Sequence, residues 1–148
     1  MAALIENRKA RFDYDILETF EAGVELFGFE VKSVRKGQGS LVGAHIIIRG
    51  GEAFLVGATI PPYQEGNTPE NYDPARNRRL LLTKKEIALL ADKESQRGLT
   101  IVPLSVYNRS RKLKVGIAVA RGKKKYDKRE TIKKRDTDRD VRRTLKNI

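Results

Sequence analysis

The feature that most limits the possible folds is the change of composition near the C-terminus. Residues 121–148 hold 13 of the chain's 31 Lys and Arg but only 5 of its 19 Asp and Glu, a net +8 of the total +12. Their large apolar or aromatic side chains are Tyr126, Ile132, Val141, Leu145 and Ile148. These bury too little surface to offset the entropy of ordering the segment alone. We therefore expect a folded body over residues 1–120 and a tail over 121–148 that is disordered alone and helical when bound.

Composition also bounds the class of protein. With 148 residues, the chain is sized for one compact domain. It has no cysteine, which excludes disulfides, thiolate metal sites and cysteine nucleophiles and fits a cytoplasmic protein. No apolar run approaches the roughly 20 residues of a membrane span, and the N-terminal sequence lacks a signal-peptide stretch.

The positive charge predicts a polyanionic partner. A pI of about 10.1 favours phosphates or anionic lipid. Binding to a membrane surface would need a large apolar face opposite the charges, which the tail lacks. We therefore expect nucleic acid as the partner and no membrane.

Most of the body has the pattern of short β-strands. The predicted strands are 12–26, 44–49, 52–60, 99–107 and 112–120. Helical spacing is found at 29–36, closed by Gly37, and at 83–97, which opens with a capping box of Thr83 and Glu86. Residues 1–11 are predicted to be a basic arm, and 63–79 a long exposed loop that ends in arginines.

Single residues mark turns and irregularities in these segments. Gly50-Gly51 predicts a hairpin turn, Gly23 a bulge or sharp bend, and Pro103 an edge strand or a bulge. Short antiparallel strands bury their edges best by closing, so we expect a mainly β fold: an oligonucleotide-binding (OB) type antiparallel barrel with two or three flanking short helices. A two-layer α+β sandwich is the alternative, because the sequence does not show closure.

Residues with catalytic potential form no recognisable constellation. His45, the single histidine, stands beside three isoleucines, where a packed or edge-strand role competes with a catalytic one. Asp13 and Asp15 could bind a metal, whereas the tail aspartates alternate with arginines as in helical ion pairs. No nucleophile, base and orienting group occur together. We expect no enzyme activity, no cofactor and no metal.

Basic residues recur near the ends of the predicted elements: Lys32, Arg35, Lys36, Arg76, Arg78, Arg79, Lys84 and Lys85. Each alone could belong to a solvated surface, but with the tail they are typical of an RNA-binding protein. Tyr126 lies among lysines and can stack on an unpaired base, or it can pack back on the barrel. Val141, Leu145 and Ile148 form an apolar stripe at helical spacing.

Five strings stand in a fixed order along the chain: Asn7–Arg11 (NRKAR), Phe20–Gly23 (FEAG), Glu30–Ser33 (EVKS), Arg78–Leu82 (RRLLL) and Ala120–Arg129 (ARGKKKYDKR). Together they resemble the SmpB family, the bacterial SsrA-binding proteins. The resemblance implies an OB-type protein that binds the tRNA-like domain of transfer-messenger RNA (tmRNA). It also implies delivery of this RNA to ribosomes stalled on messages without a stop codon, in trans-translation. The tail would enter the empty mRNA channel and fold there as a helix.

The resemblance also implies residues for each partner. It places an RNA-contacting glutamate at Glu21 and a second contact patch at Leu81 and Thr83, the latter in place of a common asparagine. With nearby basic groups, the predicted tmRNA-binding residues are Glu21, Lys32, Arg35, Arg78, Arg79, Leu81 and Thr83. The predicted ribosome-binding residues, for small-subunit rRNA along the decoding centre and mRNA channel, are Gly122, Lys123, Lys124, Lys125, Tyr126, Asp127, Lys128, Arg129, Lys133, Lys134, Arg135 and Leu145.

Three hypotheses follow for the function. The first is a monomeric, non-enzymatic adaptor between tmRNA and the stalled ribosome. The second is a general OB-fold RNA-binding or ribosomal protein whose tail adds non-specific affinity. The third is a nucleic-acid-processing enzyme.

Overall fold

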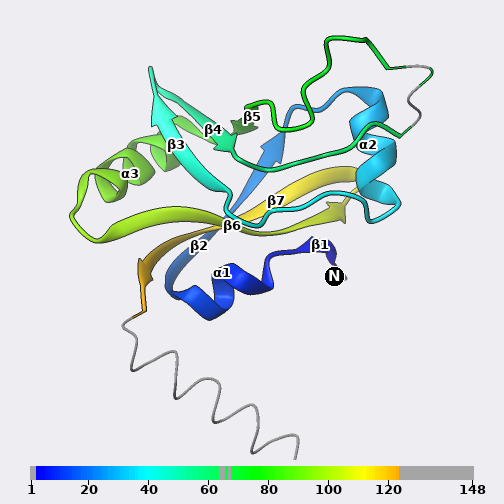
Figure 1. Ribbon diagram of the computed structural model, residues 1–148. Helices are drawn as coiled ribbons and strands as arrows, with labels where there is room; N and C mark the ends of the chain where they lie inside the picture. Colours follow the sequence, from blue (N-terminus) through cyan, green and yellow to red (C-terminus); the bar gives the residue numbers. More distant parts are fainter. Residues whose placement is uncertain (1–2, 64–65, 67, 124–148) are drawn as a thin grey trace, which may run out of the picture.

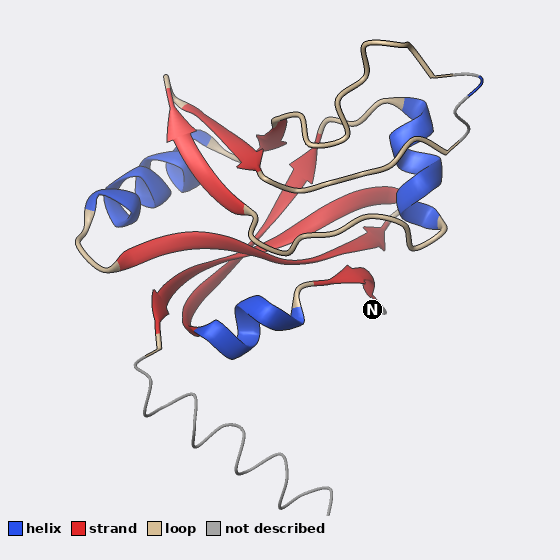
Figure 2. Ribbon diagram, in the orientation of Figure 1, coloured by secondary structure: helices blue, strands red, loops and turns tan. Residues whose placement is uncertain are grey.

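The computed structural model describes residues 3–63, 66 and 68–123, which form one seven-stranded antiparallel sheet flanked by helices (Figures 1 and 2). The strands are β1 Ala3–Glu6, β2 Tyr14–Val24, β3 His45–Arg49, β4 Glu52–Val56, β5 Arg78–Leu81, β6 Leu99–Arg109 and β7 Lys112–Gly122. The helices are α1 Arg8–Asp13, α2 Gly28–Arg35 and α3 Lys84–Ser95. Across the sheet the strand order is β1-β6-β7-β2-β5-β4-β3.

The sheet curls on itself. β3, at one end of the strand order, lies against β6 near the other end although the two are not hydrogen-bonded neighbours. The enclosed core contains side chains that are at most 2% exposed, among them Ile46, Leu55, Leu80, Ile101 and Ile117. This confirms the predicted mainly β, OB-type fold with short flanking helices. The sandwich alternative is not what the described residues form.

A second, smaller core lies on the outer face of the sheet beneath α1. It consists of Ala10, Val102, Leu104, Ala118 and Ala120, with Tyr14 and Ile16 packed against it. This core covers one end of the long strands β2, β6 and β7. At their other end the same face carries polar side chains that are only partly buried, among them Glu21 and Tyr107.

The N-terminal residues differ from the predicted basic arm. β1 pairs with β6, and α1 follows it directly. Asn7 explains why these residues are structured. Its Oδ1 caps α1 by accepting from the Ala10 amide at 3.2 Å, and its Nδ2 donates to Leu41 O and Pro103 O. A buried asparagine with all of these bonds ties the helix to two other segments, which short-range sequence patterns do not show.

The two predicted helices and the Gly50-Gly51 hairpin are confirmed. Gly37 follows α2 with φ 77°, and the Thr83–Glu86 capping box opens α3. Gly50 and Gly51 form the β3–β4 turn with φ 60° and 75°, a conformation that suits a two-residue hairpin.

Two of the predicted irregularities have different outcomes. Pro103 stands at a register shift of β6, so the predicted bulge is confirmed. At Gly23, where a bulge or a sharp bend was predicted, the strand register shows no bulge, and the register shift of β2 lies between Ile16 and Glu18. Among the described residues, no helix is long and apolar enough to cross a membrane.

Candidate nucleic-acid interface

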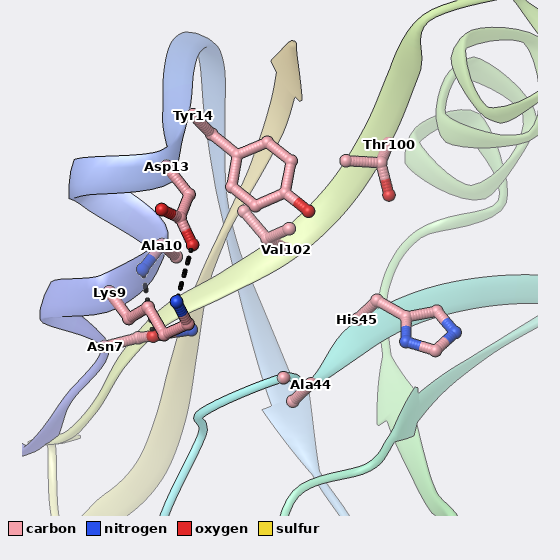
Figure 3. Close-up of a pocket in the computed structure, with 10 residues that line it drawn as sticks. Asn7, Lys9, Ala10, Asp13, Tyr14, Ala44, His45, Thr100 and Val102 are labelled. Carbon is pink, nitrogen blue, oxygen red and sulfur yellow. Dashed lines mark hydrogen bonds and ion pairs between the residues drawn. The ribbon is translucent and has the colours of Figure 1, made fainter. Parts of the chain in front are cut away.

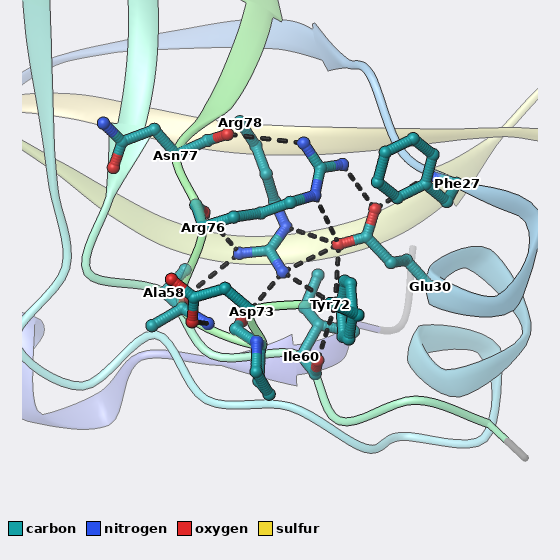
Figure 4. A network of polar contacts seen from close by, with 11 residues as sticks. Phe27, Glu30, Ala58, Ile60, Tyr72, Asp73, Arg76, Asn77 and Arg78 are labelled. Carbon is teal, nitrogen blue, oxygen red and sulfur yellow. Dashed lines mark hydrogen bonds and ion pairs between the residues drawn. The ribbon is translucent and has the colours of Figure 1, made fainter. Parts of the chain in front are cut away.

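A buried ion-pair network fixes α2 against the segment that leads into β5 (Figure 4). Glu30 of α2 is fully buried and accepts hydrogen bonds from Arg76 Nη2, Arg78 Nε and the Tyr72 hydroxyl, the last two at 2.9 Å. The Phe27 amide donates a further bond at 2.8 Å. Burial raises the pKa of Glu30, but these donors outweigh it and the pKa is lowered. The ionised carboxylate therefore holds three segments together.

The expectation of Arg78 in an exposed, RNA-binding arginine cluster is wrong. Its side chain is fully buried, and besides Glu30 its guanidinium donates to main-chain oxygens at 2.8–3.0 Å, those of Ala58, Pro74 and Arg76. A guanidinium removed from water needs such partners. Arg78 is thus a structural residue of the body, which its position in a basic string did not reveal.

Glu21 and Leu81, which belong to two separately predicted RNA contacts, lie close together on the outer face. Gly23 of β2 pairs with Leu81 of β5, so Leu81 stands one pleat beyond Glu21 on the neighbouring strand. Leu81 is 48% exposed, and a Cβ atom at Gly23 would lie 3.1 Å from its Cβ atom. The absence of a side chain at Gly23 therefore lets Leu81 lie flat on the sheet.

Two other predicted RNA residues, Arg79 and Thr83, lie in β5 and just after it. Arg79 of β5 is partly exposed and pairs with two carboxylates, those of Glu25 at 3.3 Å and Glu52 at 3.2 Å. Thr83 is exposed and occupied as the cap of α3, with its Oγ1 accepting from the Glu86 amide at 3.2 Å.

Glu21 is held by two side chains that the sequence did not reveal. Its Oε2 accepts from the Tyr107 hydroxyl at 2.6 Å and from Arg109 Nη1 at 2.8 Å. Both donors come from β6, and β7 passes between them and Glu21 with Gly116 at the crossing. A Cβ atom at Gly116 would lie 3.5 Å from the Tyr107 ring, an ordinary van der Waals distance, so the ring passes directly beside this residue.

Electrostatics support the same geometry. The bonds from Tyr107 and Arg109 lower the pKa of Glu21. Burial and the bond to Glu21 raise the pKa of Tyr107 to about 12. At neutral pH the carboxylate is therefore ionised and the phenol protonated, and both of these bonds end on Oε2.

Beside this cluster is a groove of about 320 Å³, between α2 and the β6–β7 turn. Its apolar floor includes Val31, Leu81 and Leu113, and its rim carries four cations: Arg35, Arg111, Lys112 and Lys114. We call it the α2 groove. Arg35 Nη2 donates to the Arg111 main-chain oxygen at 3.2 Å, which ties the helix to the turn across the groove.

A second hollow, also of about 320 Å³, lies between α1 and the start of β3 (Figure 3). It contains His45 and the ion pair of Lys9 with Asp13 at 3.2 Å. Figure 3 shows the His45 ring turned away from that pair, and no hydrogen bond joins it to any described residue. An imidazole without an orienting partner is a poor catalytic base. Among the described residues, no group of three side chains that could ligate a metal ion is found.

Comparison with known proteins places this geometry in a family. Residues 4–147 match the family model described as SmpB protein. The chain belongs to the SmpB family.

Curated relatives and a solved structure agree. An SsrA-binding protein of Ligilactobacillus salivarius is 52% identical over 98% of this chain and 93% of its own length. That of Lactobacillus delbrueckii subsp. bulgaricus is 56% identical over 95% and 91%. A solved chain from "tmRNA-SmpB: a journey to the center of the bacterial ribosome" matches with a TM-score of 0.68 and 44% identity, over 86% of this chain and 92% of that one.

In this SmpB-family chain the last described residues before 124 lie beside α1. Gly122 is still a strand residue that pairs with Tyr14, and the Lys123 amide donates to Asp13 O at 2.9 Å. The other predicted ribosome-binding residues lie outside the described part of the chain: Lys124, Lys125, Tyr126, Asp127, Lys128, Arg129, Lys133, Lys134, Arg135 and Leu145.

Proposed function

We propose that this SmpB-family chain is an RNA-binding adaptor of trans-translation. It binds the tRNA-like domain of tmRNA and delivers that RNA to ribosomes stalled on messages lacking a stop codon. The family membership carries this conclusion, because the match spans nearly the whole chain. The body and tail act as separate parts, the protein changes no covalent bond, and it works as a monomer in the cytoplasm.

The strand register supports a division of labour between two ends of the body. Glu21 pairs with Gly116 at the α2 end of β2 and β7, whereas Tyr14 pairs with Gly122 at the α1 end (Figure 1). At roughly 3.3 Å per residue, these two points are about 20 Å apart. One end can therefore hold tmRNA while the chain continues from the other toward the ribosome.

We assign tmRNA contact to Glu21 and Leu81, together with Lys32, Arg35, Arg79 and Thr83. Glu21 is the informative residue, since a carboxylate near RNA must accept a hydrogen bond from a base or a 2′-OH or else repel phosphate. We assign the ribosome contact to the predicted tail residues, beginning at Gly122.

The test separates RNA binding from delivery. One variant lacks residues 124–148 and keeps the hydrogen-bonded Gly122 and Lys123; the other is Glu21→Ala. Binding of the tRNA-like domain and tagging of a nonstop message are measured for each. We expect the truncated chain to keep most of its RNA affinity and lose tagging, and Glu21→Ala to lose RNA affinity with little change in its salt dependence.

A different result would favour a general RNA-binding protein. In that case truncation would weaken binding to the tRNA-like domain and to an unrelated RNA hairpin alike, in proportion to the cations removed. The matched control is Glu18→Ala, an exposed carboxylate of the same strand, which should bind RNA normally. A covalent change in RNA incubated with the chain and a divalent metal would contradict the non-enzymatic role.

A further inference from the structure

The α2 groove combines an apolar floor with a cationic rim, and this pairing restricts what can occupy it. Its lining contains Val24, Leu26, Val31, Leu81 and Leu113, and the charged residues among its described lining are Arg35, Arg111, Lys112 and Lys114. No carboxylate belongs to that lining. A ligand that fits must therefore present an apolar surface flanked by negative charge.

We propose that the α2 groove receives one unpaired nucleotide of the bound RNA, with its base on the apolar floor and its flanking phosphates on the rim. This inference rests on the proposed function and adds a nucleotide-binding site beside Glu21. A base is planar and largely apolar on its faces, and a groove of about 320 Å³ falls within the usual range for small-molecule sites, roughly 300–1,000 Å³.

The position of the groove connects it to Glu21. Lys114 lines the groove, pairs with Gly23 across β2 and β7, and acts electrostatically on Glu21. Glu21 has Oε2 occupied by Tyr107 and Arg109. Its other oxygen can therefore accept from the sugar or base next to the inserted nucleotide, while Lys114 faces the phosphate between them.

Charge argues against the chain's own residues 121–148 as the occupant of the groove. The chain's own residues 121–148 carry a net +8 and have apolar side chains that could cover the floor. Four cations on the rim would repel that segment, whereas a polynucleotide gains from each of them. A base paired within a duplex is also excluded, because its faces are covered by its neighbours and cannot reach a recessed floor.

The experiment uses the full-length chain and the tRNA-like domain of tmRNA. Each unpaired nucleotide is replaced in turn by an abasic residue, which removes the base and keeps the phosphate. We expect one position to weaken binding by roughly tenfold, the usual value of one stacked base. In the Val31→Ala protein, whose groove floor has less apolar surface, the same abasic change should reduce affinity by a clearly smaller factor. The matched control is Val42→Ala, since Val42 is 57% exposed and does not line the groove.

The outcomes separate the groove from the proposed function. Specific binding of the tRNA-like domain with no abasic position costing more than twofold would overturn the groove and leave the adaptor role intact. An abasic effect of equal size in wild type and Val31→Ala would overturn it as well. Should Val31→Ala fail to fold, 2-aminopurine at the sensitive position decides: a fluorescence change on binding that Arg35→Ala reduces supports insertion, and an unchanged signal contradicts it. Equal affinity for an unrelated hairpin would contradict the proposed function itself.

Discussion

At the scale of single residues, Tyr107 shows how a side chain far along the sequence sets the geometry of a contact. Its hydroxyl and the Arg109 guanidinium both bind Oε2 of Glu21, across β7 and beside Gly116. Two donors on one oxygen fix the rotamer of the carboxylate, so that Oε1 has a defined direction. Pre-set acceptors lose less entropy when RNA binds.

Replacing Tyr107 by Phe tests this positioning role. The change removes one charge-assisted hydrogen bond and keeps the ring, so we expect affinity for the tRNA-like domain to fall about fivefold, near 1 kcal/mol. The slope of affinity against salt should stay unchanged, since no phosphate contact is lost. Tyr14→Phe, at the other end of β2, is the control. A fall in the salt slope would instead make Tyr107 part of a phosphate contact.

At the same scale, two neighbouring arginines differ in what they do. Arg78 is fully buried against Glu30, whereas Arg79 is partly exposed and pairs with surface carboxylates. Removing one partner of a buried ion pair costs about 3–5 kcal/mol, and an exposed pair contributes up to about 1 kcal/mol. We expect Arg78→Met to lower the free energy of urea unfolding by several kcal/mol and Arg79→Met by less than about 1 kcal/mol. A loss of unfolding free energy for Arg78→Met as small as that for Arg79→Met would show that the Glu30 network is not essential to the fold.

At the scale of elements, the Glu30 network joins α2 to β5, and it should respond to acid. The folded-state pKa of Glu30 is lowered, so the folded state binds its proton less tightly than the unfolded state does. The resulting stability is fully present above the ordinary carboxyl pKa of 4.5 and is lost as the pH falls through the lowered value. We therefore expect the unfolding free-energy difference between wild type and Glu30→Gln to be constant near pH 7 and to shrink below pH 4.5. A difference that does not change with pH would contradict this linkage.

The β6–β7 turn is an element in which stability and function are opposed. Ser110 and Arg111 both have positive φ, 51° and 66°, where glycine or asparagine is favoured. Arg111→Gly should therefore stabilise the fold by about 0.5–1 kcal/mol, and the main-chain oxygen that accepts from Arg35 remains. The same change removes a cation from the groove rim, so RNA affinity should fall and the salt slope should flatten by roughly 0.7–0.9. The comparison is thermal unfolding against RNA titration; unchanged RNA binding would remove Arg111 from the rim.

At the scale of the whole molecule, sequence patterns predicted the helices and strands more accurately than they predicted which of these lie side by side. The hairpin at Gly50-Gly51 and the α3 cap depend on adjacent residues and were predictable. The network of Arg78 with Glu30 and the contact of Tyr107 with Glu21 join residues 48 and 86 positions apart. Such contacts depend on strand order, which one sequence does not specify. Glu21 and Leu81 were found through family resemblance, and the described fold then placed them together.

Also at this scale, the end of the body that holds Glu21 and the end that holds Gly122 should contribute independently to RNA affinity, and this can be measured. Glu21 and Gly122 lie about 20 Å apart along β2 and β7, at roughly 3.3 Å per residue. Substitutions that far apart and without shared partners change free energies additively within about 0.5 kcal/mol. In the double variant, Glu21→Ala without residues 124–148, the loss of affinity for the tRNA-like domain should therefore equal the sum of the two single losses, in kcal/mol. The control pair is Glu21→Ala with Tyr107→Phe, which share one hydrogen bond and should lose less together than their sum. Non-additivity in the first pair would mean that the tail reaches the α2 end of the body and contributes to the same RNA contact.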